Sequence, residues 1–352
     1  MGFRGGCGVV ALLCALGCSS HGTTPDAADA SDAAAADAAP DGPARGACTC
    51  CMALPFTASQ AFDVASDGTT IYVSFRSSAS SQRELGIVSG GGGGVPTMVA
   101  VADQFVLAAF EDAVFYAALS GSTYELHQRV GSSDRVLGSV TSVVPIQIAA
   151  NATDLYVFGS DASATSTLWR FSRSASAGTM PAIVATATGN PVYFALGSTV
   201  AAWTTSTGSA LVSLPGPSTP TALSESAGGL VFSGDLGFVI RGMLLTSHAS
   251  QWRIDEIVPA SATIYMSSVL INGGLDELQA DANHVYWRLI SGSEATPSAT
   301  DRSLVVSAPD GAGRSTLCNA WPSALLRQDP THLYGLEQSS PEQWVVDVLA
   351  KP

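Results

Sequence analysis

A six-residue phrase returns along this chain at a nearly constant interval. Its copies are Asp67–Tyr72, Glu111–Tyr116, Asn151–Tyr156, Asp281–Tyr286 and Asp329–Tyr334. Each begins with an acidic or amide residue five places before a tyrosine, and weaker copies begin at Gly197 and Gly234. The seven starting residues lie 37 to 48 residues apart, a period typical of radially repeated four-stranded sheets. The chain is therefore predicted to be an all-β propeller with seven four-stranded blades.

The sequence of each interval predicts strands joined by tight turns. β-branched and aromatic residues alternate with other residues at period two, as in Thr70–Ser74 and His284–Arg288, and this pattern fits pleated sheets. Asp, Asn or Gly at the start of each phrase suits the turn before such a strand. Six blades is the alternative, if the region around residues 228–270 is an insertion.

The last repeat is too short for a complete blade, because the sequence ends soon after the strand expected at 343–349. A spare strand is expected before the first full repeat, at 51–57. Pairing the two would complete the seventh blade and remove an exposed edge. We therefore predict that the N-terminal strand closes the ring.

The phrase Val285-Tyr286-Trp287 resembles the YWTD-type and related bacterial propeller repeats. The resemblance covers roughly residues 52–350. It implies the propeller architecture and no particular activity, because its motifs are short. Arg288 follows the tryptophan, where the YWTD pattern has an acidic residue.

The first 47 residues are predicted to lie outside the propeller. Residues 1–17 carry Arg4 and then a short apolar run, the pattern of a secretory signal. Ala15–Cys18 resembles a bacterial lipoprotein box, which implies lipidation of Cys18. Ordinary signal cleavage without a lipid is the alternative. Residues 18–47 are rich in Ala, Asp and Pro, cannot bury a core, and are expected to form a disordered tether to a domain at 48–352.

The charge of the chain excludes some partners. The formal net charge is −14, and Lys351 is the only lysine. No cluster of basic residues could follow a phosphate backbone or hold an anionic lipid surface. Nucleic acid is therefore not expected as a partner.

Four cysteines remain after the predicted signal and lipidation site: Cys48, Cys50, Cys51 and Cys318. An even number of cysteines in an exported protein indicates disulfides, and four cysteines allow three pairings. A bond from Cys318 to one of the other three would fasten the predicted closure.

The candidate ligand site lies on the innermost strands, which line the channel of a propeller. Four polar residues stand four places before the start of a repeat phrase: Asp63, Gln147, Tyr193 and Glu277. Leu107 and Leu325 occupy the same column. The polar four could form a central site, or they could cap strand ends and meet channel water.

Two functions remain open from the sequence. No H-E-x-x-H, G-x-S-x-G, Walker A or EF-hand motif occurs, so no catalytic residue, metal site or cofactor is assigned. The favoured hypothesis is a monomeric binding module that is anchored by lipid at the outer membrane, in the periplasm or at the cell surface. It would take a protein, glycan or small ligand on one face. The alternative is a metal-dependent hydrolase or lactonase-like enzyme with Asp63 and Glu277 in its channel.

Overall fold

The chain divides into two compact units, Met1–Asp41 and Gly42–Pro352. The computed structural model describes only residues of the second unit: 51–89, 93–144, 146–175, 178–223, 229–244, 250–258, 263–272, 274–290, 302–310, 312–319, 321, 323 and 325–352. The predicted signal, lipidated Cys18, tether, Cys48 and Cys50 lie outside the described residues.

The described strands form seven four-stranded antiparallel sheets, which confirms the predicted propeller. Blade 1 contains β2 (Gln60–Ser66), β3 (Ile71–Arg76), β4 (Arg83–Val88) and β5 (Thr97–Ala102). Blade 2 contains β6 (Gln104–Phe110), β7 (Ala113–Ser120), β8 (Thr123–Val130) and β9 (Ser133–Thr141). Blade 3 contains β10 (Gln147–Ala150), β11 (Asp154–Ser160), β12 (Thr165–Ser172) and β13 (Ala182–Thr188).

The remaining blades follow the same plan. Blade 4 contains β14 (Pro191–Leu196), β15 (Val200–Thr205), β16 (Gly208–Ser213) and β17 (Thr221–Ala222). Blade 5 contains β18 (Gly229–Ser233), β19 (Leu236–Leu244), β20 (Ser250–Val258) and β21 (Thr263–Asn272). Blade 6 contains β22 (Gly274–Ala280), β23 (Val285–Ile290), β24 (Arg302–Ser307) and β25 (Ser315–Cys318). Blade 7 contains β26 (Arg327–Gln328), β27 (His332–Ser340), β28 (Gln343–Ala350) and β1 (Met52–Thr57).

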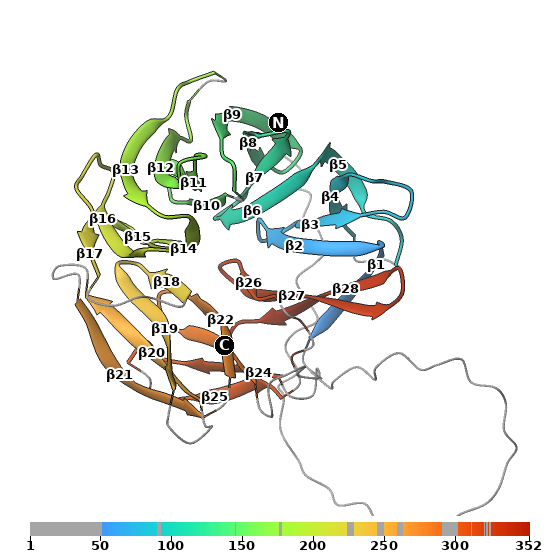
Figure 1. The fold of residues 1–352 in the computed structure, drawn as a ribbon. Helices are drawn as coiled ribbons and strands as arrows, with labels where there is room; N and C mark the ends of the chain where they lie inside the picture. The colour runs from blue at the N-terminus through green and yellow to red at the C-terminus, as the bar shows by residue number, and fades with distance from the viewer. Residues whose placement is uncertain are drawn as a thin grey trace, which may run out of the picture. The chain divides into compact units, whose positions relative to one another are not determined.

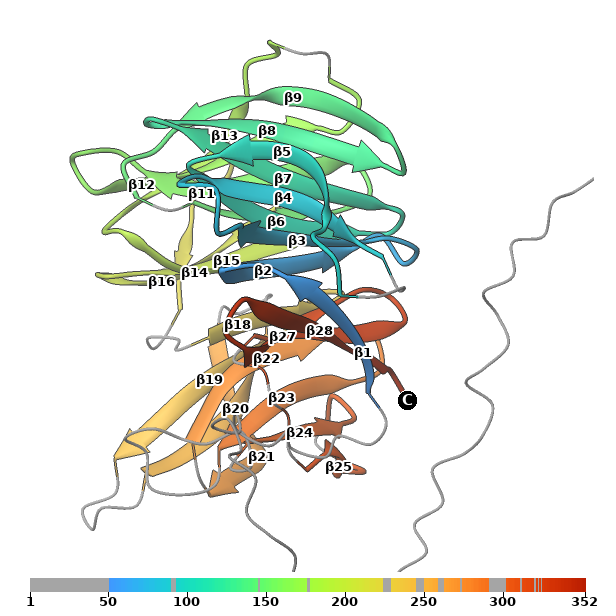
Figure 2. The ribbon, with the colours of Figure 1, turned by 90° about the vertical axis from the view of Figure 1, so that its right-hand side faces the viewer.

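The blades stand around a common centre (Figure 1). The innermost strands contact one another in sequence from β2 through β6, β10, β14 and β18 to β22, and β26 returns to β2. Figure 2 shows the sheets from the side, with β1 beside β28 although these strands come from opposite ends of the chain. No helix in the described part of the chain is long and apolar enough to cross a membrane.

Strand β1 closes the ring as predicted. It pairs antiparallel with β28 from Met52 opposite Val348 to Thr57 opposite Gln343. The amide N–H of Ala58 then donates to the carbonyl of Glu342 at 3.0 Å. The outer strand of the last blade therefore comes from the other end of the domain, and closure depends on pairing residues nearly 300 positions apart.

Most repeat phrases form the same turn between the first and second strands of a blade. The Oδ1 of Asp67 accepts the N–H groups of Thr69 and Thr70, at 2.9 and 2.7 Å. Asn151, Asp281 and Asp329 bind the same two positions of their own turns. These are side-chain-to-backbone turns of the kind that Asp and Asn favour. The repeated acidic or amide residue is thus explained by local folding.

The Glu111 copy differs from these four. Phe110 pairs directly with Ala113, so Glu111 is in a two-residue turn, where its φ is 53°. A hairpin of this length requires left-handed backbone at the turn. The phrase in blade 2 therefore matches the repeat in spacing but not in turn geometry, and this displaces the residues before it by comparison with the other blades.

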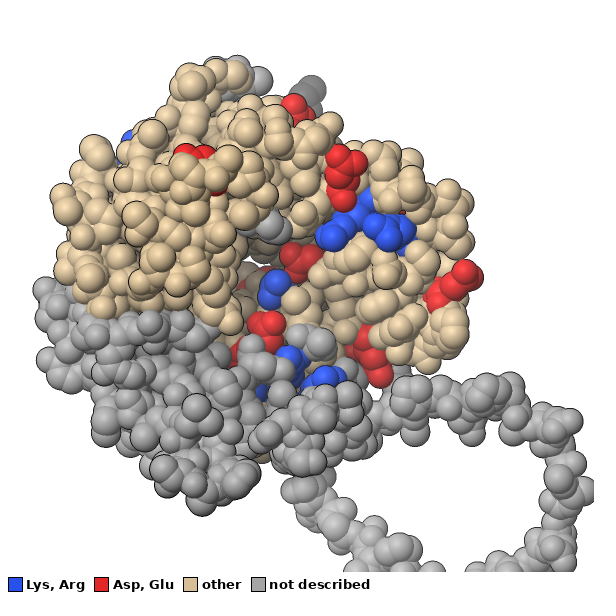
Figure 3. Space-filling view, viewed as in Figure 1, with Lys and Arg blue, Asp and Glu red and all other residues tan. Residues whose placement is uncertain are grey.

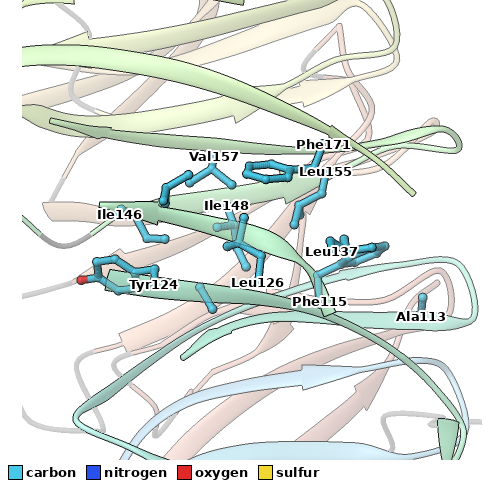
Figure 4. Close-up of a cluster of buried hydrophobic side chains, with 12 residues drawn as sticks. Ala113, Phe115, Tyr124, Leu126, Leu137, Ile146, Ile148, Leu155, Val157 and Phe171 are labelled. Carbon is cyan, nitrogen blue, oxygen red and sulfur yellow. The ribbon is translucent and has the colours of Figure 1, made fainter. Parts of the chain in front are cut away.

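The core consists of clusters between neighbouring blades. One of them, drawn in Figure 4, packs Phe115 and Leu126 of blade 2 against Leu155, Val157 and Phe171 of blade 3. The tyrosines of the repeat phrases are almost fully buried in such clusters. Burial of one large aromatic side chain contributes roughly 1.5–3 kcal/mol, so each repeat fastens its blade to the next.

Of the four cysteines predicted to form disulfides, the structure describes Cys51 and Cys318. Cys318, at the end of β25, is buried, and Cys51 packs against the same cluster at the junction of blades 6 and 7. The closing strand therefore brings Cys51 to the neighbourhood of Cys318. The disulfide pairing of Cys48, Cys50, Cys51 and Cys318 stays a prediction.

Candidate ligand-binding cavity

The innermost strands surround a cavity of about 980 Å³ to which all seven blades contribute residues. Its volume is in the range of small-molecule sites, about 300–1,000 Å³. Figure 3 shows a hollow at the centre of the ring of blades, with acidic and basic side chains at its rim. The cavity is the place where the chain brings polar residues together from distant parts of the sequence.

The four predicted channel residues all line this cavity: Asp63, Gln147, Tyr193 and Glu277. They occupy equivalent positions in blades 1, 3, 4 and 6. Each pairs with the residue seven places after the start of its repeat phrase: Ser74, Phe158, Thr204 and Arg288, respectively. The repeat therefore places one polar side chain from each of four blades at an equivalent position on the cavity wall.

Backbone irregularities accompany three of these positions. The strand register shifts between Ala61 and Asp63, between Pro191 and Tyr193, and between Leu275 and Glu277. Such bulges leave one extra residue on the inner strand and change the direction of the side chains that follow. In each case the bulge comes directly before the cavity residue.

Two positions of the same sequence column do not share this arrangement. Leu107 pairs with Tyr116, two places off the ring position, because the blade 2 turn is shorter. Although it borders the cavity, it is buried in the cluster with Tyr72. Leu325 lies before β26 and packs in the core between blades 7 and 1.

An ion pair across the junction of blades 7 and 1 is the main polar feature of the wall. The Nε of Arg327 lies 3.0 Å from the Oδ1 of Asp63. A second guanidinium nitrogen donates to the carbonyl of Leu326 at 3.0 Å. The Asp63 side chain is 13% exposed and the Arg327 side chain 35% exposed, so the pair is held firmly but still reaches the cavity.

Three glutamines tie the inner strands of different blades together. The Nε2 of Gln147 donates to the carbonyl of Val192 in blade 4, at 2.7 Å. Gln279 donates to the carbonyl of Leu326 at 3.2 Å, and Gln328 to that of Ala280 at 2.6 Å. These bonds fix the amide orientations, because the donor side of each amide is committed to the backbone.

Lys351, the only lysine of the chain, does not line the cavity but links two residues that do, Asp281 of blade 6 and Gln328 of blade 7. The Nζ of Lys351 lies 3.1 Å from Asp281 and 2.8 Å from the Oε1 of Gln328. Burial lowers the pKa of Lys351, although the Asp281 carboxylate opposes that shift. Burial raises the pKa of Asp281, but hydrogen bonds from Asn283, Tyr286 and Lys351 outweigh it and hold that pKa below its usual value.

Sequence reasoning missed Arg327, Gln279 and Gln328. Arg327 stands two places before Asp329, opposite Tyr334. The matching places in blades 1 and 3 are Ala65 and Ala149. A comparison of this second column across the repeats would have shown that a large basic residue replaces alanine in one blade. In the described part of the chain, no three His, Cys, Asp or Glu side chains are placed to hold a metal ion.

The fold is shared with several solved propellers. The chain is similar to the β-propeller domain of the Trilobed protease from Pyrococcus furiosus, with 9% identity and a TM-score of 0.55 over 84% of this chain and 97% of that chain. It is also similar to the WD40 domain of Toxoplasma gondii coronin, with 11% identity and a TM-score of 0.51 over 85% and 87% of the two chains.

A third similar structure is the tricorn protease, with 10% identity and a TM-score of 0.54 over 84% of this chain. The match spans 34% of that protease. No protein-family model and no curated protein matches the sequence. At these identities the comparisons establish the class, a β-propeller of four-stranded blades, and leave the resemblance to YWTD-type repeats a prediction.

Proposed function

We propose that this protein is a non-enzymatic binding module whose central cavity holds a small ligand. The observation that supports this best is the convergence of four equivalent polar positions on one cavity, beside the Asp63–Arg327 ion pair. Pre-formed concave sites with a few fixed polar groups are characteristic of ligand binding. The glutamine bonds between blades keep that arrangement rigid before a ligand arrives.

The metal-dependent hydrolase is the second candidate. Its support is the pair of carboxylates, Asp63 and Glu277, on the cavity wall, and the similarity to propellers of proteases. A cation at Asp63 would have to displace or tolerate the guanidinium of Arg327 at 3.0 Å. Like charges at such a distance repel strongly, so binding without metal chemistry suits this wall better.

Arg327→Gln is expected to abolish the stabilisation of the protein by small ligands. A panel of neutral, anionic and cationic metabolites should include compounds that raise the melting temperature of residues 48–352, and the variant should lose that rise because it removes the guanidinium. Arg135→Gln is the matched control, since Arg135 is exposed on β9 and does not line the cavity. Equal responses of both variants and of the wild type would contradict the cavity as the site, whereas a rise produced only by metal ions would favour the hydrolase.

We also propose that the protein is exported and held at a membrane by a lipid on Cys18. The support is the lipoprotein-like sequence Ala15–Cys18 and the tether-like composition that follows it. Cells that express the full chain should incorporate labelled palmitate into it, and Cys18→Ala should remove the label and release the protein from the membrane fraction. Cys14→Ala should leave both unchanged. Label retained in Cys18→Ala would overturn the proposal.

A further inference from the structure

Two of the carboxylates that line the cavity form ion pairs with basic side chains. Asp63 is paired with Arg327, and Asp281 with Lys351. Glu277 is the register partner of the buried Arg288. Of these charged residues, Asp63, Glu277, Asp281 and Arg327 line the cavity. A charged ligand gains little from Asp63 and Asp281, because both carboxylates already have a basic partner.

A carboxylate and a guanidinium in contact provide a different kind of recognition. The carboxylate only accepts hydrogen bonds and the guanidinium only donates them. A hydroxyl group can donate to the first and accept from the second, and two adjacent hydroxyls can engage both. The Asp63–Arg327 pair, fixed at 3.0 Å and partly exposed, presents this combination at the edge of the cavity.

Tyr193 adds an apolar surface to the same cavity. It is 43% exposed, as is its neighbour Val192, although both are large hydrophobic residues. The bulge in β14 comes directly before Tyr193. The bond from Gln147 to the Val192 carbonyl holds this strand in place. That bond uses the Nε2, so the Oε1 of the same amide remains an acceptor group.

We infer that the cavity binds a neutral polyhydroxylated ligand, that is, a sugar or short oligosaccharide. The Asp63–Arg327 pair would bind neighbouring hydroxyls, and the exposed Tyr193 would pack against the C–H face of the ring. This inference rests on the proposed function, since it names the class of ligand for the same cavity. It departs from that proposal in excluding amines, carboxylates and phosphates as the principal ligands.

The test is calorimetric titration of residues 48–352 with five probes: maltotriose, cellotriose, chitotriose, spermidine and citrate. At least one of the three neutral sugars should bind, and the two charged probes should not. Tyr193→Ala should weaken sugar binding at least tenfold, whereas Tyr193→Phe should retain it because the ring is kept. Met180→Ala is the control, since Met180 is 85% exposed and outside the cavity.

The outcomes separate this inference from the proposed function. Binding of spermidine or citrate, lost in Arg327→Gln, with no sugar bound, would overturn the sugar inference and keep the cavity as a ligand site. Sugar binding that is equal in wild type, Tyr193→Ala and Arg327→Gln would place the sugar elsewhere and overturn the inference as well. If none of the five probes binds and the metabolite panel also gives no stabilisation, both proposals fail.

Discussion

Replacing Asp329 by alanine is expected to lower the free energy of unfolding by about 3–5 kcal/mol. Its side chain is fully enclosed, with 0% exposure. It accepts hydrogen bonds from the Tyr334 hydroxyl and from the amides of Thr331 and His332. Ser66 of blade 1 also donates to it, at 3.0 Å. Alanine would leave these buried donors without an acceptor at the junction of the first and last blades, and urea unfolding measures the loss.

The matched control for this prediction is Asp161→Ala. Asp161 accepts similar bonds from Ser163 and Thr165 in the turn after β11, but it is exposed. Water can replace an exposed acceptor, so the unfolding midpoint of this variant should hardly change. Similar losses in the two variants would show that turn geometry, and not the junction between blades 7 and 1, accounts for the effect of Asp329.

The Asp329 contribution should also depend on pH. Burial raises the pKa of Asp329, but the hydrogen bonds from Tyr334, Thr331, His332 and Ser66 prevail and hold that pKa below its usual value. A carboxyl group with a lowered pKa in the folded state stabilises it fully above the unfolded pKa of about 3.9. That stabilisation is lost as the pH falls through the lower, folded pKa. The stability difference between wild type and Asp329→Asn should therefore shrink below about pH 4.

The repeat phrase was enough to predict the blades because its residues act locally. Asp67, Asn151 and Asp281 form the turns that their spacing from the tyrosine suggests. The closing strand was predictable for a second reason, namely that the last repeat lacks a strand and residues 51–57 supply one. Both inferences depend on counting elements along the chain, which needs no knowledge of side-chain packing.

The cavity was predictable only in part. The position four places before the phrase identified Asp63, Gln147, Tyr193 and Glu277, because equivalent positions of a radial repeat meet at the centre. It misplaced Leu107, since the two-residue turn at Glu111 shifts the register of blade 2. It also missed Arg327, whose importance comes from contact with Asp63 across 264 residues of sequence. Turn type and contacts between the first and last blades depend on the three-dimensional structure, and aligned repeat positions do not reveal them.

Phe56→Ala should be the most damaging single substitution in the closing strand, with a loss of about 3–5 kcal/mol. Phe56 is 1% exposed, and its ring meets that of Phe75 edge to face, with centroids 6.5 Å apart. The surrounding cluster contains Val73 of blade 1 and Val346 of blade 7. Alanine would leave a cavity at the point where the closing strand joins these two blades. Denaturant unfolding gives the loss directly.

Met52→Ala provides the comparison within the same strand, because Met52 begins β1 but is 56% exposed. Its backbone pairing with Val348 is unchanged by the substitution, so stability should stay within about 0.5 kcal/mol of the wild type. Hydrogen exchange separates packing from pairing: Phe56→Ala should speed exchange in β28 as well as in β1, because an open junction exposes the edge of β28. If Phe56→Ala were as stable as Met52→Ala and β28 stayed protected, the ring would be held shut by other blade contacts and the closing strand would be dispensable.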